Sequence, residues 1–501
     1  MHILSPIIET PLQVLIERIK DIKVLVIGSG TAGVTTAIEL ASRGVGPVAI
    51  LEAGPLVLTE HVGSSPFARR DDLAPAIHDL VRYPTSWTST QEHAGGVRRA
   101  NNMAWSAVGG RTIFWGGCTP RFDAHDFADW PFGLDEFSPY YDRAEKLMRV
   151  SGSRAGSPHF FSGDEQDAII GKLNRAGIPA SRAPLGVDTS EGHNGNISHG
   201  FDSAIARLLR SGYLARLDTV ASLQGKICLT ADVMVARLHV EGGRVTAVDL
   251  HDQKTGQTST VVVHCRVVLA GGAIQSTRLA MASGIDGGNG LVGRYLGDHL
   301  FVQGLMKLKE APRDPALYVL VNPSEKDRYQ IQLQGCFSET WYSPYHATVW
   351  LDPHPEGRYV LFYCFGSGSV EYNNRLHLDP GEKTGAGMRD YSVVYDRSAL
   401  DLSLLEDMQA CIPRVCEAMG AELVRMQVNE PGSALHEIGG LRMGTDAASS
   451  VTDEWGCFHH LNNLSVADSA TWPYQGPANS YLSITAWSLR HADGLARRLA
   501  E

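Results

Sequence analysis

The 501-residue chain is poor in cysteine, and its eight cysteines are scattered without the close spacing of a disulfide-stabilised scaffold. It also lacks any apolar run near the roughly 18 residues that a membrane helix needs. No basic cluster is present, and 44 Lys and Arg against 55 Asp and Glu give a formal net charge of −11. We therefore expect reduced thiols, no membrane span and no nucleic-acid partner.

The amino terminus has little of what a secretory leader needs. No basic stretch precedes its apolar residues, and Glu9, Glu17 and Arg18 interrupt the apolar pattern. With 43% hydrophobic and 20% charged residues, the composition is that of a globular protein. These features predict a folded protein located in the cytoplasm.

The strongest local signal is a glycine-rich turn between a strand and a helix. An apolar run at 23–27 precedes Gly28, Gly30 and Gly33, and a helical pattern follows. A second apolar run ends at Glu52, about 20 residues beyond the third glycine. This order predicts a βαβ unit whose helix N-terminus binds a pyrophosphate and whose acid binds ribose hydroxyls. A glycine turn without a cofactor is the alternative, and the motif itself does not distinguish FAD from NAD.

The rest of the chain divides into regions of different character. Residues 225–285 read as strands that lead into a helix. Between about 301 and 400, apolar and polar residues alternate, as in an antiparallel sheet with one solvated face. Helices are expected over 398–426 and 480–499. The pattern predicts a second domain that differs from the glycine-turn domain.

Six glycine- and polar-rich segments follow one another along nearly the whole chain. They are GGRTIFWGG at 109–117, LAGGAIQSTRL at 269–279, LVGRYLGDHL at 291–300, LHEIGGLRMG at 435–444, LNNLSVADS at 461–469 and PANS at 477–480. In order and spacing these segments resemble the glucose–methanol–choline (GMC) oxidoreductase family. Within that family the chain is most similar to the pyranose-oxidase-like, sugar-oxidising branch.

The resemblance implies an α/β fold with two domains. One is a FAD-binding, Rossmann-like doubly wound domain, and the other is a substrate domain built on an antiparallel sheet. The FAD-binding domain is expected to be discontinuous and to comprise 20–60, 95–150, 205–300 and 435–501. The substrate domain is expected to comprise 61–94, 151–204 and 301–434.

The resemblance also implies the cofactor contacts. Phe114 stands where some pyranose oxidases carry a histidine that tethers the flavin, so the FAD is expected to be bound non-covalently, and no metal site is predicted. The implied contacts are Gly28, Gly30, Gly33 and Glu52 on the ADP half of FAD, Val233 on the adenine side, Asp468 near the pyrophosphate and ribitol, and Gly110, Trp115 and Gly116 in the flavin-contacting segment.

His436 and Asn479 fall where the family keeps its catalytic His and its His/Asn partner. Oxidising an alcohol requires removal of the hydroxyl proton while the carbinol hydrogen leaves as hydride to flavin N5. A neutral imidazole is a suitable base at neutral pH, and an amide holds the same oxygen without titrating. Asn479 also precedes the last helix, whose positive end stabilises negative charge on a reduced flavin. The alternatives are a structural histidine and an asparagine that only caps the helix.

The resemblance implies oxidation of an alcohol group of a sugar, glycoside, aminosugar or cyclitol to a carbonyl. Oxygen or another electron acceptor would regenerate the cofactor, and the oligomeric state is left open. The acidic net charge favours approach of a cationic aminosugar, because charges steer encounter. Three alternatives stay open: an NAD(P)H-dependent flavoprotein reductase, a GMC-type lyase with non-redox FAD, and a flavin-stabilised binding protein without activity.

Two features outside these motifs need an interpretation. Cys411 and Cys416 have the spacing of a redox pair, which the reductase alternative would use. They lie in a helical pattern where residues five apart face different directions, so we expect them in the core. The acidic cluster Asp123, Asp126 and Asp129 is expected to form a solvated, turn-rich surface.

Overall fold

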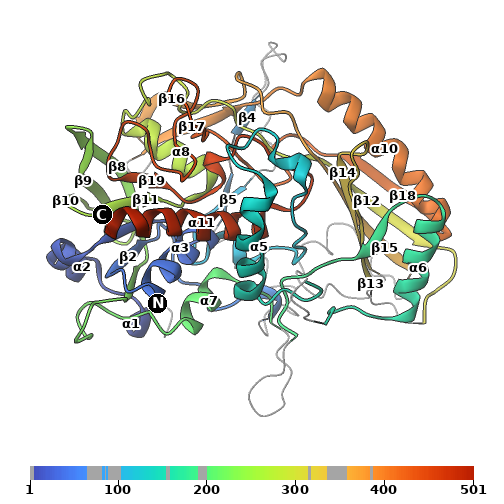
Figure 1. Ribbon diagram of the computed structural model, residues 1–501, viewed down its shortest axis with the longest axis horizontal. Coiled ribbons are helices and arrows are strands. Elements are labelled where there is room, and N and C mark those ends of the chain that lie inside the picture. Colours follow the sequence, from blue (N-terminus) through green and yellow to red (C-terminus); the bar gives the residue numbers. More distant parts are fainter. Residues whose placement is uncertain are drawn as a thin grey trace.

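The computed structural model describes residues 5–64, 82–84, 86–88, 103–153, 158–189, 200–313, 317–335, 358–383 and 388–500. Two sheets dominate it and lie toward opposite ends of its long axis (Figure 1). One is parallel and is packed with helices, and the other is a larger antiparallel sheet. The predicted fold class, an α/β flavoprotein-like domain with a second domain on an antiparallel sheet, is confirmed.

The parallel sheet has five strands in the order β19-β11-β1-β2-β7. All four neighbouring pairs run parallel. Short apolar, β-branched segments build it because strands covered on both faces need no polar alternation. Its strands are β1 (Val24–Ile27), β2 (Val48–Leu51), β7 (Ile227–Thr230), β11 (Arg266–Leu269) and β19 (Leu464–Val466).

Helices cover the parallel sheet and connect its strands. The long C-terminal helix α11 lies beside α3, far from it in sequence (Figure 1). The helices are α1 (Ser5–Ile8), α2 (Leu12–Arg18), α3 (Thr31–Ser42), α5 (Leu134–Met148), α7 (Ala204–Arg210), α8 (Gly272–Ala282) and α11 (Ser480–Ala500). None of the helices in the described ranges has both the length and the apolar character needed to cross a bilayer.

The antiparallel sheet has six strands in the order β18-β12-β15-β14-β13-β6. Helix α10 (Ala399–Met419) lies along its outer face, with α6 (Asp164–Arg175) near one edge (Figure 1). An apolar core fills the space between this face and α10. The strands are β6 (Ala180–Arg182), β12 (Leu300–Leu308), β13 (Leu317–Val321), β14 (Tyr329–Gly335), β15 (Tyr359–Gly366) and β18 (Ala421–Val428).

Three smaller sheets complete the fold. Strands β8 to β10 form one of their own, so the segment predicted at 225–285 contributes only its first and last strands to the parallel sheet. These sheets contain β8 (Val233–Glu241), β9 (Arg244–Asp252) and β10 (Thr258–Val262); β4 (Ser86–Thr88), β16 (Arg375–Lys383) and β17 (Arg389–Val394); and β3 (Arg82–Pro84) with β5 (Met103–Trp105).

The helix predicted over 398–426 was wrong in its second part. Helix α10 ends at Met419, and Gly420 takes a left-handed conformation with φ of +75°. Glycine adopts this conformation without a steric penalty and so ends helices. The following residues form β18, which pairs with β12, because an open sheet edge offers them hydrogen-bond partners.

Candidate active site

A cavity extends from the carboxyl ends of β1, β2 and β11 to the inner face of the antiparallel sheet. This is the position at which open α/β sheets bind nucleotides. With the exception of Gly33, the structure places every predicted site residue on the wall of this cavity. Those residues are Gly28, Gly30, Glu52, Gly110, Trp115, Gly116, Val233, His436, Asp468 and Asn479.

The three glycines of the first turn have different roles in the geometry. Gly28 has φ of +111°, and an added Cβ would lie 2.4 Å from the carbonyl oxygen of Ala270. A Cβ on Gly33 would lie 2.0 Å from the carbonyl oxygen of Gly28. Around Gly30, in contrast, a Cβ would meet no atom within 4 Å. Packing thus requires Gly28 and Gly33, whereas Gly30 keeps space open in front of α3.

Glu52, at the end of β2, is buried. Its carboxylate connects the first glycine turn to the residues that follow β2. One carboxylate oxygen accepts hydrogen bonds from the backbone N–H of Ser29 at 3.0 Å and from its hydroxyl at 2.7 Å. The other accepts from the N–H of Gly54 at 3.0 Å. Burial raises the pKa of this carboxyl above its ordinary value, while these bonds oppose that effect. The side chain therefore fixes the turn and still faces the cavity.

Asp468 performs a similar task at the N-terminus of α8. Its Oδ2 accepts from the N–H of Gly272 at 2.8 Å and from the hydroxyl of Ser276 at 2.6 Å, and its Oδ1 accepts from the N–H of Ala470 at 2.9 Å. Burial raises its pKa to about 6. The carboxylate thus holds the start of α8 beside the cavity.

The second glycine-rich segment lies opposite the first. Gly110 begins a short 3₁₀ helix, and a Cβ there would lie 3.4 Å from the Cα of Gly30, so the two glycine turns approach closely. Trp115 is held by a hydrogen bond from its Nε1 to the carbonyl oxygen of Asp202 at 2.7 Å. Its ring also meets that of Tyr481 edge-on, with centroids 4.3 Å apart. Backbone and rigid aromatic surface form this wall.

This set of residues fits FAD. The space left open at Gly30 lies at the N-terminus of α3, where no side chain caps the helix. Unpaired N–H groups and the helix dipole favour a diphosphate at such a place. An acid at the end of the second strand and the close glycine turns complete the arrangement expected for a dinucleotide.

The far part of the cavity contains two histidines in contact. His299 Nδ1 and His436 Nδ1 lie 2.9 Å apart, and His299 Nε2 lies 2.6 Å from the carbonyl oxygen of Gly476. A carbonyl only accepts, so His299 carries its proton on Nε2. Burial lowers the pKa of His299 to about 4 and holds that of His436 well below its usual value. Both rings are therefore neutral at pH 7, His299 Nδ1 accepts, and His436 Nδ1 donates.

This arrangement fixes the tautomer of His436. With its proton on Nδ1, the lone pair lies on Nε2. His436 is only half-buried and lines the cavity. Within the described part of the chain, no hydrogen bond occupies Nε2. The geometry gives the cavity a neutral acceptor.

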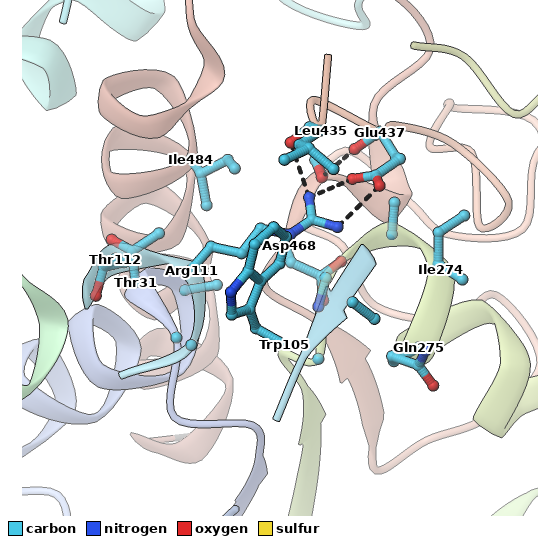
Figure 2. Close-up of a pocket in the computed structure, with 18 of the residues that line it drawn as sticks. Thr31, Trp105, Arg111, Thr112, Ile274, Gln275, Leu435, Glu437, Asp468 and Ile484 are labelled. Carbon is cyan, nitrogen blue, oxygen red and sulfur yellow. Dashed lines mark hydrogen bonds and ion pairs between the residues drawn. The ribbon is translucent and has the colours of Figure 1, made fainter. Parts of the chain in front are cut away.

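Two residues, Arg111 and Asp298, hold the loop that carries His436. Leu435 has φ of +63°, a conformation that costs energy for a residue with a side chain. Arg111 donates to the Leu435 carbonyl at 2.7 Å and grips the Glu437 carboxylate with two nitrogens, as the dashed lines in Figure 2 show. Asp298 accepts from the N–H of His436 at 3.0 Å. These contacts hold the strained turn in place.

Asn479 immediately precedes α11, but its side chain does not point back to that helix. Its Oδ1 accepts hydrogen bonds from Gln330 Nε2 at 2.8 Å and from Gln332 Nε2. Both glutamines lie on β14 of the antiparallel sheet. The alternative role, a cap of α11, has no side-chain hydrogen bond behind it among the described residues, and Asn479 instead contacts the other half of the molecule.

Two sequence interpretations meet a clear outcome outside the cavity. Cys411 and Cys416 are free and buried in the core under α10, as expected, and they do not line the cavity. The solvated surface predicted at Asp126 was wrong, because this side chain is 1% exposed and pairs with Arg328. Burial raises its pKa to about 6. The partner lies far away in sequence, which local reasoning could not include.

Sequence reasoning missed several residues at the end of the cavity beside the antiparallel sheet. We call this end, which contains His299 and His436, the reaction end. Their signals were present but weak: His299 stands in the LGDHL segment, Arg111 in the second glycine segment, and the glutamines alternate along one strand. The role of these residues follows only from the contacts that they make in the folded structure. The missed residues are Arg111, Asp298, His299, Gln330, Gln332, Gln334 and Glu437.

The fold and the cavity together define a dinucleotide-binding protein of the α/β class. GMC oxidoreductase family models match residues 22–301 and 374–488. The chain belongs to the GMC oxidoreductase family, which confirms the predicted family, the predicted class of enzyme and FAD as the cofactor. Enzymes of this family act on alcohol groups, so that coarse activity also holds for this chain.

Individual proteins resemble the chain over most of its length. 6'''-Hydroxyparomomycin C oxidase of Streptomyces lividus is 28% identical over 97% of this chain and 92% of its own. 2-Methyl-1,2-propanediol dehydrogenase of Mycolicibacterium austroafricanum is 25% identical over 95% and 96%. A structure of formate oxidase from Aspergillus oryzae RIB40, reported for its FAD modification, superposes with a TM-score of 0.70 at 14% identity and covers 96% of this chain and 98% of its own. This last likeness concerns the fold.

Proposed function

We propose that the protein oxidises an alcohol group of a sugar, glycoside, aminosugar or cyclitol to a carbonyl, with His436 as the base. The observation that carries this proposal is the contact between His436 Nδ1 and His299 Nδ1 at 2.9 Å. It leaves a neutral imidazole with its acceptor nitrogen in the cavity, which is what removal of a hydroxyl proton needs.

In this mechanism the hydroxyl group of the substrate donates to His436 Nε2. As the proton moves onto the ring, the imidazolium formed is stabilised by its hydrogen bond to His299. Asn479 lies on the same cavity wall and holds the substrate oxygen. Bound FAD supplies the acceptor for the hydride that leaves the carbinol carbon.

We further propose that FAD is held by contacts alone. Phe114 lines the cavity and stands where, by the resemblance, some pyranose oxidases carry a tethering histidine, and a phenyl ring has no nucleophilic atom to bond a flavin. Gly28, Gly30 and Glu52 would hold the ADP half, and Val233 the adenine side. Acid or heat denaturation should therefore release all of the flavin into solution, and yellow colour retained by the polypeptide would reject this point.

The substrate class is supported by the wall that faces the two catalytic groups. Phe301 and Phe365 stack with centroids 4.7 Å apart, and Gln332, Gln334 and Tyr363 lie on the same wall. Aromatic faces and amides together suit a ring that carries several hydroxyls. The relative that is named an oxidase of hydroxyparomomycin C and the relative that is named a propanediol dehydrogenase agree with a polar alcohol.

An anaerobic substrate screen tests the proposal. Sugars, aminosugars and cyclitols should bleach the flavin absorbance faster than simple monohydric alcohols. Bleaching by NADPH alone would favour a flavoprotein reductase. Turnover of an added alcohol without any bleaching would favour a lyase. Repeating the screen at several salt concentrations tests whether charge steers a cationic aminosugar, because that advantage should fall as ionic strength rises.

A further inference from the structure

Strand β14 turns three glutamines toward the cavity side of the antiparallel sheet. Tyr329, Ile331 and Leu333 alternate with them and enter the core under α10. The glutamines are almost fully buried, with 0% exposure for Gln330, 3% for Gln332 and 2% for Gln334. Buried amides must find hydrogen-bond partners, because an unpaired one costs the free energy of its desolvation.

These amides form a directed chain of hydrogen bonds. Gln334 Nε2 donates to the hydroxyl of Tyr318 at 2.7 Å, and that hydroxyl donates to Gln332 Oε1 at 2.9 Å. Gln332 Nε2 then donates to Asn479 Oδ1, which also accepts from Gln330 Nε2 at 2.8 Å. Every bond between Gln334 and Asn479 points the same way, and all of them end at one amide oxygen.

The end of this chain decides which atom Asn479 presents to the cavity. With Oδ1 occupied by two donors, Nδ2 is directed away from β14. Nδ2 donates no hydrogen bond to the residues that the structure describes, and Asn479 lines the cavity. Resting on the proposed function, we infer that Gln330 and Gln332 are positioning residues that fix Asn479 as a hydrogen-bond donor to the substrate oxygen.

Two separate sets of hydrogen bonds then give the reaction end one acceptor and one donor. The one through Gly476 and His299 makes His436 Nε2 an acceptor, and the one through Gln332 makes Asn479 Nδ2 a donor. An alcohol matches both, because its hydroxyl hydrogen donates to the imidazole while its oxygen accepts from the amide. As the proton leaves, negative charge grows on that oxygen and the amide N–H stabilises it.

Replacing Gln332 with Glu tests the direction of the chain. A carboxylate cannot donate, so it should turn Asn479 until Nδ2 faces β14 and Oδ1 faces the substrate. The Gln330 amide can turn with it, because Gln330 Oε1 accepts no hydrogen bond from the described residues and can then accept from Nδ2. We expect flavin reduction by a saturating sugar substrate to slow by about 10- to 100-fold at pH 8, since a donor to the developing oxyanion is replaced by an acceptor. FAD content should be unchanged, because Gln332 lies at the other end of the cavity.

Acidification distinguishes positioning from a merely structural effect. Once protonated, the carboxyl group introduced by Gln332→Glu donates again, so the rate of this variant should recover as pH falls from 8 toward 5, whereas the wild-type rate should not rise. Gln332→Met neither donates nor ionises, and its loss should not depend on pH in this way. A Gln332→Glu rate equal to wild type, or a loss that acid does not reverse, would overturn the inference.

Gln303→Glu is the matched control. Gln303 lies on β12 of the same sheet and also donates to an asparagine Oδ1, that of Asn429 at 2.9 Å, but it does not line the cavity. Its rate should stay near wild type at both pH values. Asn479→Ala separates the two proposals: if it leaves flavin reduction unchanged, the proposed use of Asn479 fails, whereas a slow Asn479→Ala beside an unimpaired Gln332→Glu rejects only the role of the glutamines.

Discussion

The two ends of the cavity are built in different ways. At the end beside the parallel sheet, two glycine turns and the start of α3 present backbone, and an acidic side chain, Glu52, follows within the same βαβ unit. At the end beside the antiparallel sheet, side chains line the cavity, and both His436 and Asn479 contact partners more than 100 residues away, His299 and Gln332. A wall of backbone groups is local in sequence, whereas a wall of paired side chains is assembled by the tertiary fold.

The change with the largest expected effect impairs the chemistry at the reaction end and leaves FAD binding at the other end intact. His436→Ala should slow flavin reduction by about 10² to 10⁴, the usual contribution of a positioned base. FAD content should stay that of wild type, because the His436 ring bonds His299 and contributes no bond to either glycine turn. Stopped-flow reduction and the absorbance ratio of flavin to protein measure the two effects. A wild-type reduction rate would assign the base to another residue.

The second change breaks the cofactor end and spares the chemistry. Glu52→Ala should weaken FAD binding by about 1.5–3 kcal/mol, since a charged acceptor for the ribose hydroxyls is lost along with bonds to Ser29 and Gly54. The fraction that still holds FAD should be reduced by substrate at the wild-type rate. Titration of apoprotein with FAD gives the affinity, and an unchanged value would remove Glu52 from the cofactor site.

The third change sharpens the account of the reaction end. His299→Leu removes the acceptor of the His436 Nδ1 proton, so the proton is free to occupy Nε2, and the rate of flavin reduction should fall about tenfold.

Wild-type flavin reduction should hold its rate as pH falls from 7 to about 5, because a base works while it is unprotonated and burial keeps the His436 pKa well below its usual value. A wild-type rate that already falls near pH 6.5 would contradict the lowered pKa of His436.

The smallest change separates ligand binding from folding at a single glycine. Gly30→Ser should raise the stability of the apoprotein by about a few tenths of a kcal/mol, because serine caps a helix better than glycine. It should also lower FAD affinity, since the new side chain fills the space left open in front of α3. Thermal melts of the apoprotein and FAD titration give the two signs. A drop in apoprotein stability would mean that Gly30 serves packing as Gly28 does.

The glycine turn, Glu52 and the family resemblance allowed the fold class, the cofactor and its binding end to be predicted. At the reaction end, the sequence predicted His436 as a base and Asn479 as a partner of the substrate oxygen, but not the tautomer of the imidazole or the direction of the amide. The identity of a residue fixes neither the tautomer of its imidazole nor the orientation of its side-chain amide. The domain boundaries, the cytoplasmic location and the electron acceptor stay predictions.

The sequence by itself determined what depends on neighbours along the chain: the strand–turn–helix at Gly28 to Gly33, the acid that ends β2, and the buried cysteines of α10. Only the tertiary structure decided that β18 is a strand and that Asp126 is buried against Arg328. It also decided that His436 Nδ1 meets His299 and that Asn479 Oδ1 accepts from the glutamines of β14. The physical reason is that hydrogen-bond direction and protonation depend on partners in space. Gly476, His299 and the glutamines of β14 become those partners when the two sheets close over one cavity.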